Sequence, residues 1–116
     1  MHELSLCEDL MQQVISIAKA HHAERVVRII IRIGPLSGIE PQLLASAFTI
    51  SKAGTLAEEA VLLTESQPIH VHCNQCGAES AASVNNLSCT ACGALDTKLL
   101  SGDELILASV ELESPD

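Results

Sequence analysis

The fold of this chain is decided by two short stretches, Cys73-Asn74-Gln75-Cys76-Gly77 and Cys89-Thr90-Ala91-Cys92-Gly93. Each is a CxxC pair followed by a glycine, which lets the backbone turn sharply just after the second sulfur. Two such turns supply four thiolates, and a site with four protein ligands leaves no position for water or substrate. We therefore predict a structural zinc site whose ligands are Cys73, Cys76, Cys89 and Cys92.

Disulfide bonds and redox chemistry are the weaker interpretations of these cysteines. Disulfides need an oxidising compartment, whereas the opening Met1-His2-Glu3 is polar and acidic, with no apolar run behind it that would indicate a signal peptide. A redox CxxC normally stands alone, on a strand-to-helix turn. We therefore expect a cytoplasmic, zinc-binding protein. The fifth cysteine, Cys7, lies at helical spacing with apolar residues and is predicted to be a small buried side chain.

The composition limits the possible partners. The chain has 116 residues, 47% of them hydrophobic but only one aromatic, and a net charge of −9. Neutralising phosphates needs a basic face, and stacking on bases usually needs aromatic side chains, so a nucleic-acid partner is not expected. No apolar run approaches the length of a membrane span. Nor is there a nucleophile–base pair or a phosphate-binding glycine loop, so we do not expect an enzyme.

Hydrophobic periodicity predicts an α+β fold. Residues 4–22 read as an amphipathic helix, and a second helix begins at Pro41 and ends near Gly54. Residues 25–33, 60–66 and 104–113 alternate as strands, and in the first of them Val27, Ile29, Ile31 and Ile33 should share the apolar face. We predict two helices packed on a three-stranded antiparallel sheet, with an inserted zinc-ribbon-like module.

Residues 70–102 differ from the rest, because they are rich in Cys, Asn, Ser, Ala and Gly. A segment this short cannot build an adequate apolar core, so metal binding should supply much of its folding free energy. We therefore assign residues 70–102 to a zinc-binding domain, and residues 1–69 with 103–116 to an α/β domain.

Several segments together resemble the HypA/HybF family of nickel-delivery proteins for hydrogenase maturation. They are Met1-His2-Glu3, Ile33-Gly34-Pro35-Leu36-Ser37-Gly38 with Pro41, Ala47-Phe48, Gly54-Thr55, Ala60, both CxxC-Gly pairs and Gly102-Asp103-Glu104-Leu105. The match runs in order along essentially the whole chain. The resemblance implies an N-terminal nickel site, remote from a structural zinc site. It also implies partnership with a HypB-type GTPase and with the large-subunit precursor of a [NiFe]-hydrogenase, and some family members also serve urease. We expect a monomer or a weak homodimer.

The chemistry of the first three residues supports that implied nickel site. A free α-amino group titrates at about pH 8 and so is readily available as a nitrogen donor. Together with the deprotonated amide and the imidazole of His2 it offers three nitrogens in one plane, an arrangement that suits Ni(II) and Cu(II). Glu3, a partner or water would complete the site, and Met1 must be retained. Few ligands at a chain end suit transient cargo. The alternative for His2 and Glu3 is a solvated, frayed terminus.

The remaining histidines carry weaker hypotheses. His21 and His22 are expected to cap the end of the first helix rather than to bind metal. His70 and His72 lie two apart and should point the same way on an extended strand, where a role beside the zinc site is one option. The alternative function for the whole chain is a zinc-ribbon protein-interaction module without nickel delivery.

Overall fold

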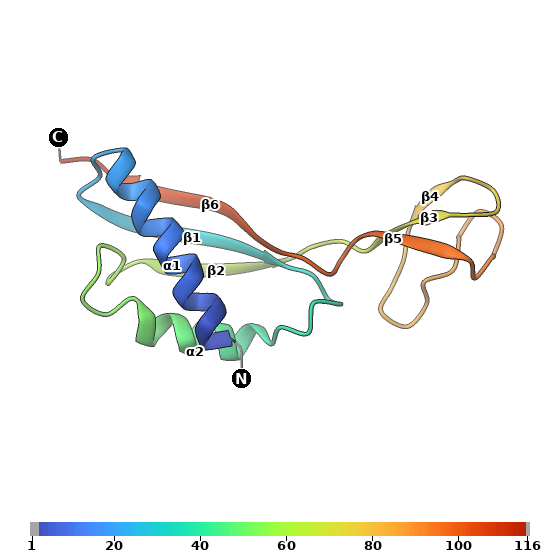
Figure 1. The fold of residues 1–116 in the computed structure, drawn as a ribbon, viewed down its shortest axis with the longest axis horizontal. Helices are drawn as coiled ribbons and strands as arrows, with labels where there is room; N and C mark the ends of the chain where they lie inside the picture. Colours follow the sequence, from blue (N-terminus) through green and yellow to red (C-terminus); the bar gives the residue numbers. More distant parts are fainter. Residues whose placement is uncertain (1–2, 116) are drawn as a thin grey trace. The chain divides into compact units, whose positions relative to one another are not determined.

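The computed structural model describes residues 3–115 and divides the chain into two compact units (Figure 1). The first unit comprises residues 3–31, 39–65 and 106–115, and the second unit comprises residues 32–38 and 66–105. No helix in the described part of the chain combines the length and the apolar character needed to cross a membrane.

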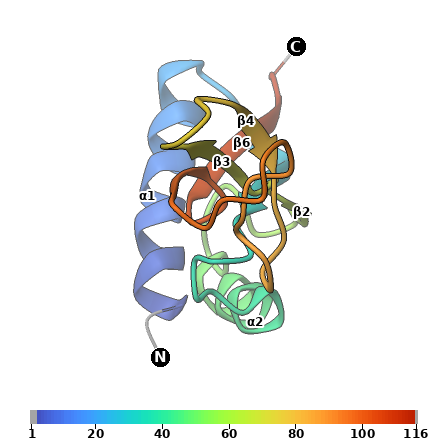
Figure 2. The same ribbon diagram turned by 90° about the vertical axis from the view of Figure 1, so that its right-hand side faces the viewer.

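The first unit contains two helices and the larger sheet. Helix α1 (Glu3–Ala20) lies along one face of the sheet, and helix α2 (Pro41–Ser51) packs against α1 (Figures 1 and 2). The sheet has the order β2-β1-β6, with β1 (Arg25–Ile33) at its centre, β2 (Val61–Ser66) on one side and β6 (Leu105–Glu113) on the other. The predicted fold class, two helices on a three-stranded sheet with an inserted module, is confirmed.

The strand directions differ in one respect from the expected all-antiparallel sheet. Strand β6 is antiparallel to β1. Glu24 N, just before β1, donates to the oxygen of Glu113 at the end of β6 (2.8 Å), and Gly34 N, just after β1, donates to the oxygen of Glu104 just before β6 (2.8 Å). Strand β2 runs in the same direction as β1: Val26 N donates to Leu56 O, ahead of β2, and Gln67 N, just after β2, donates to Ile33 O. The connection through α2 explains this, because a helical crossover returns the chain parallel to the strand it left.

The core of the first unit is aliphatic. Most of its buried apolar side chains come from α1, β1 and α2, and two come from the segment after α2: Cys7, Leu10, Met11, Val14, Ala18, Val26, Ile29, Ile31, Leu44, Ala47, Phe48, Ala57 and Ala60. The predicted burial of Cys7 is therefore confirmed. The predicted apolar face of β1 is wrong at its first position, since Val26 is 1% exposed and Val27 is 37% exposed. Strict alternation fails there, because the buried positions step by three residues, from Val26 to Ile29.

The second unit is built around a small antiparallel sheet with the order β4-β3-β5. Its strands are β3 (His70–Cys73), β4 (Glu79–Ala81) and β5 (Thr97–Ser101). Few apolar side chains are buried here, chiefly Ile33, Ile69 and Val71, together with the sulfur-bearing Cys73 and Cys89. A core this small cannot offset the conformational entropy of ordering the segment, so a further source of stability is required.

Candidate metal centre

The four cysteines of the two CxxC pairs converge in the second unit. The sulfur atoms of Cys73, Cys76, Cys89 and Cys92 all lie within 4.8 Å of one another, and this is the only such group of His, Cys, Asp or Glu ligand atoms within residues 3–115. Two contacts between the pairs, Cys73 Sγ to Cys92 Sγ and Cys76 Sγ to Cys89 Sγ, are each 3.6 Å. Around a tetrahedral zinc ion with bonds of about 2.3 Å, sulfurs lie about 3.8 Å apart. A disulfide would need about 2.05 Å, so the geometry fits a metal site and not a pair of bridges.

The two CxxC turns are near copies of each other. Cys73 N donates to Ala78 O (2.8 Å) and Cys89 N donates to Ala94 O (2.9 Å), which closes each loop at the same place. Gly77 and Gly93 follow the second sulfur with φ of 78° and 79°, a left-handed conformation that costs other residues free energy. The sequence thus folds each pair so that both sulfurs lie on one side of a tight turn.

Backbone amides and neighbouring thiols make the four sulfurs unequal. The amides of Cys76 and then Gln75, at 3.3 and 3.4 Å from the sulfur, lower the pKa of Cys73 to about 6. The amide of Ala94 favours the thiolate of Cys92, but the hydrogen bond between Cys92 and Cys73, partial desolvation and the other two neighbouring thiols outweigh this and raise the pKa of Cys92 to about 12. Four adjacent thiolates repel one another, so the full set is stable only when a cation neutralises it.

Polar contacts that the sequence did not indicate brace this cluster. Asn74, inside the first CxxC, donates its backbone N–H to Asp96 O (2.9 Å) and its side-chain amide to Asp96 Oδ1 (3.0 Å). The Thr97 hydroxyl donates to Leu87 O (2.7 Å). The first two bonds join the loop after β3 to the residue before β5, and the third joins the first residue of β5 to the segment before the second CxxC pair. They were missed because Asn74 and Asp96 are 22 residues apart, and nothing local in either segment specifies the pairing.

The predicted nickel ligands Met1 and His2 lie outside the described residues, while Glu3 begins helix α1. Glu3 is only 6% exposed, the sole charged side chain counted as buried in the described chain. Its carboxylate accepts a bond from Glu40 N (3.5 Å), and Glu40 in turn caps α2 by accepting from Gln42 N (3.4 Å). A buried acid anchored to a second helix does not behave as a frayed terminus, so that interpretation of Glu3 is wrong.

Glu40 is the residue near the chain start that sequence reasoning missed. A signal for it was present, because Pro41 occupies the first position of α2 and residue 40 is therefore the N-cap. What the sequence does not contain is the contact between the start of α1 and the start of α2. The structure places two carboxylate-bearing residues, Glu3 and Glu40, at that junction.

The other histidines are not members of the four-cysteine group. His21 follows α1, which ends at Ala20, and its Nδ1 lies 3.0 Å from Ile17 O, consistent with the predicted capping of the helix end. His70 and His72 lie on β3, immediately before the first CxxC.

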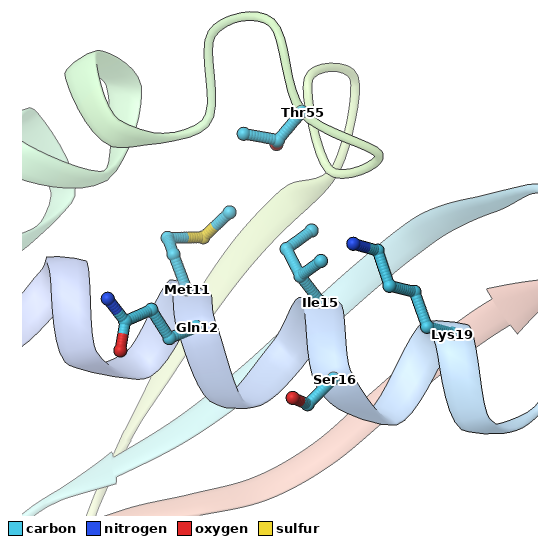
Figure 3. Close-up of a pocket in the computed structure, with 6 residues that line it drawn as sticks. All are labelled: Met11, Gln12, Ile15, Ser16, Lys19 and Thr55. Atoms are coloured by element: carbon cyan, nitrogen blue, oxygen red, sulfur yellow. The ribbon is translucent and has the colours of Figure 1, made fainter.

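A hollow of about 470 Å³ on the first unit does not belong to a metal site. It lies between α1 and the segment after α2 and is lined by Met11, Gln12, Ile15, Ser16, Lys19 and Thr55 (Figure 3). Its lining offers no histidine, cysteine or carboxylate ligand. This hollow therefore has no metal-binding role.

Comparison with known proteins identifies the family. The family described as "HypA: Hydrogenase/urease nickel incorporation, metallochaperone, hypA" matches residues 1–112. The chain belongs to the HypA family. Its similarity to the hydrogenase maturation factor HypA of Nitrosospira multiformis is 46% identity over 112 residues, 97% of each chain. The HypA of Aquifex aeolicus is 40% identical over 113 residues, which covers 97% of this chain and 98% of that relative.

Solved HypA structures share the fold. The solution structure of the Ni metallochaperone HypA from Helicobacter pylori superposes with a TM-score of 0.75 at 24% identity, covering 98% of this chain and 99% of that one. A second solution structure of a HypA protein gives 0.76 at 24% identity, covering 97% and 96%. The resemblance of the sequence to the HypA family is thus confirmed at the level of family and fold.

Proposed function

We propose that this chain is a cytoplasmic nickel metallochaperone that binds Ni(II) at its N-terminus and delivers it during maturation of a [NiFe]-hydrogenase. The observation that carries the proposal is the match of the nickel-incorporation family over residues 1–112, which includes the start of the chain. The nickel ligands are the α-amino group of Met1 and the amide and imidazole nitrogens of His2, with Glu3 beside them.

The burial of Glu3 supports this assignment. A carboxylate held at the junction of α1 and α2 gives the start of the chain a fixed negative charge. Such a charge attracts a divalent ion toward the nitrogen donors, whether the oxygen coordinates the ion directly or stays next to it. Few protein ligands at a chain end allow the ion to be released, which a delivery protein requires and a storage protein does not.

Zinc has the structural role in the proposal. Cys73, Cys76, Cys89 and Cys92 saturate a tetrahedral ion, and the second unit buries too few apolar side chains to stabilise itself otherwise. The zinc site is thus distinct in chemistry from the nickel site. The former has four sulfurs and holds its ion permanently, whereas the latter has nitrogen donors and holds its ion transiently.

Partners follow from family membership. A HypB-type GTPase and the hydrogenase large-subunit precursor are the proposed partners in nickel transfer. The alternative, a zinc-ribbon interaction module without nickel delivery, keeps the cysteine cluster but assigns no role to His2. The two proposals therefore differ in the effect of changes at the first residues.

A cellular experiment tests delivery. The chain, or its His2→Ala variant, is expressed in a hydrogenase-producing bacterium that lacks its own HypA, and hydrogenase activity is measured at low and at millimolar nickel. We expect the unaltered chain to restore activity at low nickel and His2→Ala to restore it only with added nickel, since excess ion bypasses delivery. Failure of both proteins to restore activity at low nickel would favour the interaction module, and equal restoration by both would reject His2 as a nickel ligand.

A further inference from the structure

Two histidines on β3 share one face of the small sheet. His70 and His72 alternate with Val71 and Cys73, both of which are buried, while His70 is exposed and His72 is partly exposed. Residues two apart on a strand are separated by about 6.6 Å and point to the same side. The two imidazoles therefore extend from the face opposite to Cys73, and neither belongs to the cysteine cluster.

The hydrogen bonds around His70 indicate which of its ring nitrogens is available. The Ser101 hydroxyl donates its single hydrogen to Pro68 O at 2.8 Å. Its oxygen also lies 3.4 Å from His70 Nδ1, and in that contact it can only accept. Nδ1 of His70 therefore carries the proton, and Nε2 presents its lone pair to solvent. Metal-binding histidines have this arrangement, in which a bond at one ring nitrogen fixes the other as the ligand.

His72 has a carboxylate in the same relation. Glu79 lies opposite His72 in the register of β3 and β4, and its Oε2 is 4.0 Å from His72 Nδ1. A carboxylate beside Nδ1 favours the proton there and leaves Nε2 as the ligand, as in carboxylate–histidine–metal arrangements. In the register of β3 and β5, Lys98 lies opposite His72, and its positive charge partly offsets the negative charge of Glu79. Acidic residues outnumber Lys and Arg in residues 66–105: the only Lys or Arg there is Lys98, and the acids are Glu79, Asp96, Asp103 and Glu104.

We propose that His70 and His72 form a second transition-metal site, on the exposed face of the second unit, that takes Ni(II), Cu(II) or Zn(II) through the two Nε2 atoms. Water completes the coordination. A hollow of about 620 Å³, whose lining includes His70, Glu79 and Ser101 but not His72, leaves room for water on the His70 side of the ion. Imidazole nitrogens are suitable ligands for these three metals. The site depends on the folded second unit and is independent of the proposed nickel site at the chain start.

The experiment uses zinc-loaded protein that carries a few extra residues before Met1, so that the terminal site is blocked. Ni(II) is titrated by calorimetry, and zinc is measured in each sample. We expect one equivalent of Ni(II) to bind, with a lower affinity than the terminal site has in protein with its natural start. We expect affinity to fall at least tenfold in His70→Ala and in His72→Ala, and about tenfold in Glu79→Gln, which loses only the partner of a ligand. His21→Ala with His22→Ala is the matched control, because it removes two adjacent histidines elsewhere, and its binding should not change.

Three results would overturn the proposal. They are no Ni(II) binding by the extended protein, equal binding in the His70→Ala variant, and loss of binding in the control. His72 adjoins Cys73 in the sequence. If the His72→Ala variant loses zinc, the His70→Ala variant decides the outcome, because His70 is exposed and this variant should keep all of its zinc. Cu(II) provides an independent measurement, since its electron paramagnetic resonance spectrum should show coupling to imidazole nitrogens that disappears in the same variants. Failure here leaves the terminal site untouched, because that site is tested in protein with its natural start.

Discussion

In the second unit, Gly34 lies directly against the backbone of Gly102, and Gly34→Ala is expected to be strongly destabilising. A Cβ at residue 34 would lie 2.2 Å from Gly102 O, 2.3 Å from its carbonyl carbon and 2.8 Å from Asp103 N. All three atoms belong to the backbone, so no side-chain rotation relieves the clash. Two hydrogen bonds cross the same contact, from Gly34 N to Glu104 O and from Leu36 N to Gly102 O, each 2.8 Å.

The expected cost is the sum of two effects. Overpacking of a tight contact costs about 1–3 kcal/mol. Pushing the two segments apart also weakens two backbone hydrogen bonds worth about 1 kcal/mol each. Gly34→Ala should therefore lower the free energy of unfolding by about 3–5 kcal/mol. The chain has no Trp or Tyr, so urea unfolding of the zinc-loaded protein is followed by far-ultraviolet circular dichroism.

Gly38→Ala is the matched control. Gly38 has a φ of 77°, but a Cβ there would meet nothing within 4 Å, so the cost should be only about 1–2 kcal/mol of backbone strain. Because Gly34 meets a steric clash and Gly38 does not, Gly34→Ala should cost at least about 1 kcal/mol more than Gly38→Ala. Equal losses at the two positions, or no loss at Gly34, would refute this reasoning.

Three further predictions concern the core and the cysteines. Leu44→Ala should lower the free energy of unfolding in urea by about 2–5 kcal/mol, because Leu44 is 0% exposed. Leu43 is 52% exposed, so Leu43→Ala should change that free energy by no more than about 0.5 kcal/mol. Similar losses in the two variants would contradict the assigned core. Cys89→Ser should lose zinc, and the dispersed amide NMR signals of residues 66–105 should collapse while those of α1 survive. Cys7 is a buried cysteine outside the cluster, so Cys7→Ser should keep its zinc. Full zinc content in Cys89→Ser would reject the four-sulfur site. Folding lowers the pKa of Cys73 from 9.0 to about 6, chiefly through the amide of Cys76, so the stability that this thiolate contributes is complete above pH 9 and lost as the pH falls through 6. Protons compete with zinc for the thiolates, so zinc measured with a colorimetric chelator should be retained at pH 7 and released progressively at acid pH below 6, and complete retention at pH 4 would contradict this.

The local elements were predictable because their signals are local. The run of β-branched residues in 25–33 predicted β1 with its observed bounds, and the paired CxxC-Gly turns predicted the convergence of four sulfurs. In both cases the relevant information lies within a few residues: side-chain shape for the strand, and ligand spacing with a glycine for each turn.

Features that depend on distant segments were not predictable from local patterns. The parallel direction of β2 depends on how α2 crosses the sheet, and the burial of Glu3 depends on its contact with Glu40, 37 residues away. Alternation predicted that Val27 would be buried at the beginning of β1, but Val26 is buried instead, so packing overrides alternation there. Sequence alone also did not indicate that Ser101 would fix the tautomer of His70, since β3 and β5 are brought together only by the folded second unit.

The central claim is that the first residues bind nickel while the four cysteines hold zinc, and a nickel titration of untagged, zinc-loaded protein with its natural first residue tests it most directly. We predict a high-affinity equivalent of Ni(II) that disappears in His2→Ala and in protein extended before Met1, with bound zinc unchanged in all three samples. The same high-affinity uptake in all three, or none in the untagged protein while its zinc is intact, would contradict the account.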